Sequence, residues 1–331
     1  MFGYLRFFLA FLVLLSHIDV RVYGLNPGVI AVVIFYMLAG YVVSHLFYDV
    51  LPSTHKLTSF YKDRLLRIFP LYLYISIVTL IFLGLSGFGT PHLSLKNLLA
   101  NALIIPLNYY MYFDFTILKE PNWWLIPPAW SLGTELQAYI LLPIALIFRS
   151  LKIVLAIVSF LVYIAANASW LHPEYFGYRF VVGVFFIFLI GSMIQYRRTH
   201  QLHKLAFEKL FPYIVWVVTA VLMLFYAYTN GFSLGYTKET FIGILFGMPL
   251  VMIISQMKRK LAGDAFLGSL SYAIFLSHFL VIWILQHFGY FSTSKFTYVF
   301  FLTLLSLLIG YIGVTFVEKP LQKIRHYRRN R

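Results

Sequence analysis

Long apolar stretches recur along the whole chain and are separated by short polar connections. Most are close to the roughly 20 apolar residues that a helix needs to cross the hydrocarbon core of a membrane. A membrane β-barrel would show short segments of alternating hydrophobicity instead. The pattern therefore predicts an all-α, polytopic membrane helix bundle. We expect about ten transmembrane helices, at residues 4–22, 27–47, 68–88, 128–148, 152–170, 178–196, 211–229, 239–257, 268–288 and 295–317.

The stretch between residues 95 and 127 departs from this pattern. Its apolar part, "LSLKNLLANALIIPL", is short for a span and has Pro106 near its end. We interpret residues 95–112 as a re-entrant or interfacial segment. A full span here would move every later loop to the other side of the membrane.

Composition supports a membrane protein. The chain is 61% hydrophobic and 11% charged, whereas soluble domains are about 45–50% apolar and about 25% charged. It has no cysteine, which excludes disulfides, thiolate nucleophiles and cysteine metal sites. We find no internal repeat and no long soluble loop. We therefore expect residues 1–331 to form one integral-membrane domain without an appended soluble domain.

The net charge of +15 is explained by membrane topology. With a cytoplasmic N-terminus, 20 of the 26 lysines and arginines lie on the cytoplasmic side. The positive-inside rule favours this orientation, with both termini in the cytoplasm, so no nucleic-acid partner is needed. The six on the other side are Arg21, Lys96, Lys119, Arg179, Lys238 and Lys295.

The first apolar segment contains a histidine that a simple anchor would not need. Arg6 and His17 are 11 residues apart, so a continuous helix would place them on nearly the same face, about 16 Å apart along its axis. Ionisable residues inside a membrane are expensive and usually functional. The alternative is that Arg6 is a topology signal and that His17 bonds to a neighbouring helix.

A carboxylate follows in "PPAWSLGTELQAYILLP", where Pro128 suits a helix start. Glu135 would lie about 10 Å inside that helix, at a depth similar to that of His17. A lone carboxylate there is costly unless it is paired or protonated. We therefore predict a contact between His17 and Glu135, either as a functional pair or as a structural ion pair.

Two further groups carry candidate chemistry. Arg64 and Arg67 share a helix face at the cytoplasmic mouth and can clamp a phosphate-bearing ligand, or they contact lipid headgroups. His278 lies near mid-membrane, where it assists the chemistry or serves as a packing histidine. No local metal-binding motif is present, and we expect no metal.

Several of these stretches, in order, resemble the acyltransferase-3 family of bacterial membrane acyltransferases. "LRFFLAFLVLLSH" resembles the family's arginine–ten residues–histidine signature, "RLLRIFPLY" its arginine pair, and "WSLGTELQAY" its Trp-Ser-Leu-x-x-Glu element. "FYMLAGYVVS" is similar to its second-span motif, with Ala39 where serine is common. "SLSYAIFLSH" and "VEKP" resemble the late elements, with Ser277 where an aromatic residue is usual.

The resemblance implies transfer of an acyl group, most often acetyl, from cytoplasmic acyl-CoA to a hydroxyl of a cell-surface or exported glycan. Acetyl-CoA would be the co-substrate, held by Arg6, Arg64 and Arg67. His17 would be the general base or acyl carrier, and Glu135 would orient it. The assisting residues would be His278, Ser131 and Trp130.

The expected location is the bacterial inner membrane. The expected partners are membrane lipid, a glycan or glycolipid acceptor, and a second copy or glycan-assembly proteins. Trp123, Trp124 and Trp130 are candidates for stacking on sugar, although interfacial tryptophans are common in membrane proteins. A proton-coupled transporter is the alternative function, since buried His and Glu also occur in such carriers. A non-catalytic scaffold would not need two arginines on one face.

Overall fold

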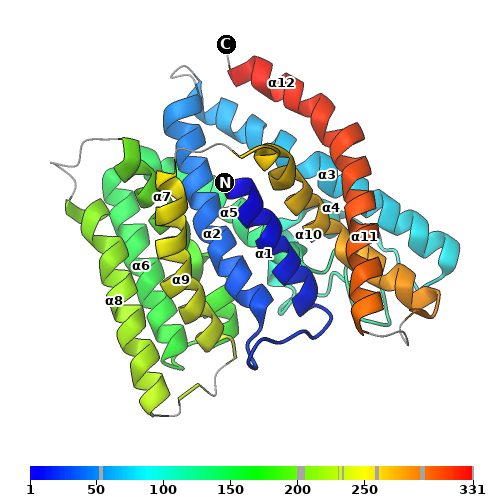
Figure 1. Cartoon of the computed structure of the whole chain (residues 1–331), viewed down its shortest axis with the longest axis horizontal. Helices are drawn as coiled ribbons and strands as arrows, with labels where there is room; N and C mark the ends of the chain where they lie inside the picture. The colour runs from blue at the N-terminus through cyan, green and yellow to red at the C-terminus, as the bar shows by residue number, and fades with distance from the viewer. Residues whose placement is uncertain are drawn as a thin grey trace. The chain divides into compact units, whose positions relative to one another are not determined.

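A computed structural model describes residues 1–51, 55–199, 206–229, 231–232, 235–257, 261–290 and 295–329. In these residues the chain is helical, and β pairing is limited to isolated bridges (Figure 1). Short π or 3-10 segments in the described residues include η1 (Leu46–Val50), η2 (Ile105–Tyr109), η3 (Tyr175–Arg179) and η6 (Val314–Glu318). The α-helices are α1 (Phe2–Ser16), α2 (Pro27–His45), α3 (Lys56–Ser86), α4 (Leu95–Leu103), α5 (Ala129–Ile147), α6 (Arg149–Asn167), α7 (Val181–Thr199), α8 (Ala206–Tyr228), α9 (Thr237–Gln256), α10 (Asp264–His287), α11 (Lys295–Gly313) and α12 (Lys319–Arg329).

The predicted polytopic helix bundle is confirmed. Every predicted span coincides with a helix, and nine helices in the described residues are long and apolar enough to cross a membrane. They are α2, α3 and α5 to α11, while α1 is a shorter apolar helix of 15 residues. The orientation in the membrane stays a prediction. Some of the basic residues counted for it lie outside the described residues, namely Lys204, Lys258, Arg259, Lys260 and Arg331.

Two predicted boundaries were wrong. Helix α1 ends at Ser16 instead of residue 22, because the chain turns there and Asp19 adopts a left-handed conformation with φ of 57°. Helix α3 begins at Lys56 instead of residue 68. Its first turns are charged and lie before the predicted span, but Asp63, Arg64 and Arg67 are paired in the folded chain, so the helix begins before the apolar stretch.

The chain packs as two compact units, each built from separate segments. Unit 1 comprises residues 1–2, 15–60 and 134–262. Unit 2 comprises residues 3–14, 61–133 and 263–331. The organisation as a single domain stays a prediction.

Unit 1 is built around the pair α2 and α7, which α6, α8 and α9 pack against (Figure 1). Two glycines allow the central helices to approach closely. A Cβ added at Gly40 would lie 1.8 Å from the carbonyl oxygen of Phe188, and one at Gly191 would lie 1.9 Å from that of Met37. Small residues at such crossings bring helix backbones together in membranes. Within the apolar windows, 83% of the residues of η3 and α7 are buried and 22% of those of α8, so α8 leaves most of its apolar side chains exposed at the surface of the protein.

Unit 2 contains the packed pair α10 and α11, followed by η6 and α12. The segment 95–112 forms α4 and η2, and at nine residues α4 is too short to span. The two asparagines of α4, Asn97 and Asn101, are buried against the protein. Asn101 donates to the carbonyl oxygens of Asn97 (2.8 Å) and Phe115 (3.0 Å) and accepts from the amide of Leu125 (2.9 Å), which fastens the following loop to α4.

Candidate functional site

A cluster of arginines lies in unit 2, where α3 meets η6 and α12. Arg64 and Arg67 come from α3, and Arg325 from α12. Arg6 of α1 joins them, since the charges of Arg6, Arg64 and Arg325 all act on Arg67. We call these four residues the arginine cluster. The i, i+3 spacing of Arg64 and Arg67 puts both on one side of α3, as predicted.

Asp63 is the counter-charge for two members of the cluster. Its carboxylate accepts hydrogen bonds from Arg64 Nε (3.1 Å) and from Arg325 Nε (3.1 Å) and Nη2 (3.2 Å). All three side chains are buried. Charge-assisted bonds in a buried setting are strong and directional, so Asp63 sets the positions of both guanidinium groups.

Glu318 is the counter-charge for Arg67. It accepts a hydrogen bond from Arg67 Nη1, and further ones from Ser269 Oγ (2.8 Å) and Gln322 Nε2 (2.8 Å). The guanidinium of Arg67 also lies 5.8 Å from the ring centroid of Tyr272. The contacts of Glu318 tie the end of η6 to α3 and α10.

The arginine cluster has more positive than negative charge. Four arginines face the two carboxylates of Asp63 and Glu318. Arg6 Nε is buried without a hydrogen-bond partner among the described residues. A buried donor left without an acceptor is costly, and an excess of buried cations is costly as well. Both features suit an anionic ligand with several acceptor oxygens, such as a phosphate group.

His278 also lies in unit 2, on α10, and is fully buried. Its Nδ1 is 3.0 Å from the carbonyl oxygen of Ile274, one turn earlier. A carbonyl can only accept, so Nδ1 carries the proton in this bond. The ring lies against Phe279, with centroids 5.1 Å apart. These contacts favour the packing interpretation of this histidine, and its assisting role stays a prediction.

Trp130 and Ser131 begin helix α5, which starts directly after Pro128 as the sequence predicts. Ser131 Oγ donates to the carbonyl oxygen of Pro128 (2.9 Å), and the Trp130 carbonyl accepts from Asn108 Nδ2 (3.2 Å). Both contacts hold the entry to α5. Trp124 was a candidate for sugar stacking, but its side chain is buried at 3% exposure and cannot present a face to a sugar in this conformation.

His17 belongs to unit 1 and lies in the turn that follows α1, with an exposed side chain. The prediction that it lies within a continuous helix was wrong, because α1 ends one residue earlier. An exposed imidazole at a helix end is accessible to a substrate. Its contact with Glu135 stays a prediction.

Glu135 lies on α5 in unit 1 and accepts a hydrogen bond from Tyr139 Oη, one turn later on the same helix. Tyr36 of α2 is nearby, since Glu135, Thr134 and Arg179 all act on its hydroxyl. Thr134 Oγ1 donates to the carbonyl oxygen of Arg179 (2.6 Å). Glu135 is thus half-buried within a polar group that α2, α5 and η3 supply, instead of an isolated carboxylate in lipid.

One member of the arginine cluster, Arg325, and three of its neighbours were missed from sequence as site residues: Asp63, Ser269 and Gln322. Asp63 had a local signal, because it directly precedes Arg64 in "YKDRLLR". Arg325 was counted only among the basic residues on the cytoplasmic side. Its role depends on the return of α12 to α3, which no local pattern reveals.

Comparison with known proteins identifies the family. A model of an acyltransferase domain matches residues 2–315. A protein of Aquifex aeolicus (strain VF5), described as uncharacterized, is 38% identical over 206 residues, which are 62% of this chain and 92% of that protein. No solved structure gives a significant match. Because the family model covers nearly the whole chain, this protein belongs to the acyltransferase-3 family and is a membrane acyltransferase.

Proposed function

We propose that the protein moves an acyl group, most often acetyl, from acyl-CoA on the cytoplasmic side to a hydroxyl of a cell-surface or exported glycan. The family membership supports acyl transfer. The choice of donor is supported by the arginine cluster, in which four buried or partly buried guanidinium groups face the carboxylates of Asp63 and Glu318.

In this proposal the arginine cluster holds the phosphates of the donor. Arg64 and Arg325 are oriented by Asp63, so the positions of both guanidinium groups are fixed before a phosphate binds. Arg67 is held by Glu318, and Arg6 contributes the buried Nε donor that lacks a partner in the described structure. Acyl-CoA supplies a thioester, whose carbonyl carbon is the electrophile of the reaction.

His17 acts as the general base. Its neutral imidazole takes the proton of the acceptor hydroxyl while the new oxygen–acyl bond forms and the carbon–sulfur bond breaks, and the proton then goes to the departing sulfur. In the alternative course, His17 carries the acyl group transiently. Glu135 stabilises the cationic imidazole, and Tyr139 orients the Glu135 carboxylate through its hydrogen bond.

The test is transfer of radiolabelled acetyl from acetyl-CoA in membranes that contain equal amounts of wild type, His17→Ala or His92→Ala. The label is read in extracted glycan and on the protein. His92 is the matched control because its side chain is also exposed and lies in a loop outside the proposed site. We expect glycan label with wild type and His92→Ala, and its loss with His17→Ala.

The two chemical courses give different protein label. An acid-labile or base-labile acetyl group on wild type, absent from His17→Ala, supports the acyl-carrier course, while unlabelled protein supports the general base. The assay is repeated with acceptors from the native host and with longer acyl-CoAs. If no glycan is labelled with any variant under these conditions, the proposed function is contradicted and a transporter is favoured. Equal activity of wild type and His17→Ala contradicts the role of His17.

A further inference from the structure

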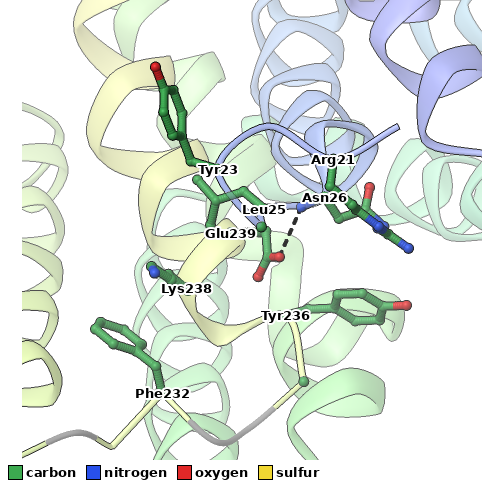
Figure 2. Close-up of a pocket in the computed structure, with 10 residues that line it drawn as sticks. Arg21, Tyr23, Leu25, Asn26, Phe232, Tyr236, Lys238 and Glu239 are labelled. Carbon is green, nitrogen blue, oxygen red and sulfur yellow. Dashed lines mark hydrogen bonds between the residues drawn. The ribbon is translucent and has the colours of Figure 1, made fainter. Parts of the chain in front are cut away.

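Unit 1 contains a pocket of about 490 Å³ that has no role in the chemistry described above (Figure 2). Its volume lies in the range of about 300–1,000 Å³ that is usual for small-molecule sites. It opens between the turn that precedes α2 and the residues that precede α9. The topology predicted from sequence places both of these connections on the outer side of the membrane. The polar, charged and aromatic residues that line the pocket are Arg21, Tyr23, Asn26, Phe232, Tyr236, Lys238 and Glu239.

The two walls of the pocket are joined by one hydrogen bond. The backbone amide of Asn26 donates to Glu239 Oε1 (3.0 Å), and Figure 2 shows this bond crossing from the α2 side to the α9 side. Asn26 Oδ1 caps α2 by accepting from the amides of Gly28 (3.0 Å) and Val29 (3.4 Å). The amide nitrogen Nδ2 of Asn26 makes no hydrogen bond in the described structure and stays available as a donor.

A tight turn presents Tyr23 at the rim. Val22 and Leu25 exchange two backbone hydrogen bonds (3.0 and 3.1 Å), and the residues between them, Tyr23 and Gly24, both have positive φ, as a type I′ turn requires. Tyr23 is 98% exposed. A non-glycine residue with positive φ is uncommon, and here this conformation places an aromatic ring in solvent at the edge of a pocket.

The lining combines aromatic rings with hydrogen-bonding and cationic groups. Tyr23, Phe232 and Tyr236 offer ring surfaces, and burial raises the pKa of Tyr236, so its hydroxyl stays a neutral donor and acceptor. Arg21 and Lys238 are the two cations of the lining. Its one carboxylate, Glu239, already accepts from Asn26, and Arg21 also donates a long, exposed hydrogen bond to Asp19 Oδ1 (3.4 Å) beside the pocket. Rings together with hydroxyl, amide and cationic groups suit a hydroxyl-rich ring that carries an anionic substituent.

The pocket connects to Glu135 through side chains of the same unit. The ring of Tyr236 lies 5.5 Å from that of Tyr178, centroid to centroid. Tyr178 in turn is an electrostatic neighbour of Tyr36, and Tyr36 of Glu135. The hydroxyl of Tyr36 is buried, and among the described residues Thr134 is its polar neighbour. A row of tyrosines thus runs from the pocket to the carboxylate that the proposed function uses.

We propose that this pocket binds an acidic saccharide of the acceptor, with its rings against Tyr23 and Tyr236 and its carboxylate or phosphate at Arg21 and Lys238. The assignment of this saccharide as the acceptor rests on the proposed function, whereas its binding does not. The donor is not required for binding, so the pocket can be tested alone.

The experiment measures equilibrium binding of fluorescent oligosaccharides to the full chain in phosphatidylcholine nanodiscs, without acyl-CoA. The acidic probes are oligomers of glucuronate, galacturonate and sialic acid, and the neutral probes are oligomers of glucose and N-acetylglucosamine. We expect at least one acidic probe to bind and the neutral probes to bind less well. Raising the salt concentration should weaken binding, because the cations of the pocket are partly exposed.

Two variants locate the binding. Tyr23→Ala should weaken saccharide binding by about fivefold, since aromatic contacts contribute about 0.5–1.5 kcal/mol. Tyr23 is almost completely exposed, so its replacement should not disturb folding. Arg21→Gln should weaken the binding of the acidic probes by about tenfold and leave the binding of the neutral probes unchanged. Tyr228→Ala is the matched control, because Tyr228 is 89% exposed in the same unit and does not line the pocket.

The proposal is overturned if no probe binds, if neutral and acidic probes bind equally, or if Tyr23→Ala and Arg21→Gln bind as wild type does. It is also overturned if phosphatidylglycerol in the nanodisc abolishes saccharide binding by occupying Arg21, since the pocket would then be a lipid headgroup site. Binding without acetyl transfer would contradict the proposed function alone. If no probe binds and acetyl transfer is the same in wild type and Tyr23→Ala, the saccharide pocket is contradicted and the proposed function is not.

Discussion

Arg325 donates hydrogen bonds to both carboxylate oxygens of Asp63, at 3.1 and 3.2 Å, although 262 positions separate the two residues in the chain. Asp63 also receives the guanidinium of its neighbour Arg64. One buried carboxylate therefore organises two cations of the arginine cluster. This geometry links the stability of unit 2 to the positions of the groups that we propose to hold the donor.

Breaking this pair should destabilise the protein. Asp63→Asn leaves Arg64 and Arg325 buried without their counter-charge, and the loss of one partner of a buried pair costs about 3–5 kcal/mol. Thermal unfolding in detergent measures the effect. In Asp63→Asn combined with Arg325→Gln, the loss should be smaller than the sum of the two single losses, by about 0.5–3 kcal/mol. Additive losses would show that the two side chains are not coupled.

Arg64→Gln should weaken use of the donor more than it slows the chemical step. A hydrogen bond to a charged group contributes about 1.5–3 kcal/mol, so KM for acyl-CoA should rise by about tenfold to a hundredfold, with a much smaller change in kcat. Steady-state kinetics at varied acyl-CoA measures both values. Arg197→Gln is the control, since Arg197 contacts Tyr213 in unit 1 and lies outside the arginine cluster. An unchanged KM for Arg64→Gln would remove this residue from donor binding.

Gly191→Val should separate the central helices of unit 1. Even a Cβ at this position would meet the backbone of Met37 at 1.9 Å, and backbone cannot move aside as a flexible side chain can. We expect a large fall in the midpoint of thermal unfolding, since overpacking costs about 1–3 kcal/mol or more. Gly84→Ala is the matched control, because a Cβ there meets nothing within 4 Å. It should be neutral or stabilise α3 by up to about 1 kcal/mol. A stable Gly191→Val protein would contradict the close crossing of α2 and α7.

Asn101→Leu should release the loop that follows η2. Asn101 is fully buried and makes three hydrogen bonds to backbone groups of residues 97, 115 and 125, and leucine replaces none of them. Limited proteolysis should then cut between residues 110 and 125, where wild type resists. Asn122→Leu is the control, since Asn122 is exposed in the same loop. Equal cleavage of wild type and Asn101→Leu would show that this network does not hold the loop.

The sequence was sufficient to predict the membrane class, the helices and the short segment at 95–112. These features depend on local properties, namely the length of apolar runs and the positions of proline and charge. Local pattern was less reliable at helix boundaries. It misplaced the end of α1, where Asp19 takes a left-handed backbone conformation that the apolar pattern does not reveal. It also misplaced the start of α3, where Asp63 is paired with Arg325 from the far end of the chain.

The candidate residues were predictable mainly from their order along the chain, which resembles a known family. Their partners were not. Asp63 and Glu318 as counter-charges, and the pocket at Arg21 and Tyr236, come from segments that are far apart in sequence. The length of each apolar run determines which residues form spanning helices, because a helix must be apolar over a given length to cross the hydrocarbon core of the membrane. Which polar side chains meet is decided by helix packing, because a hydrogen bond or ion pair needs contact within a few ångströms, and only the folded chain brings those groups together.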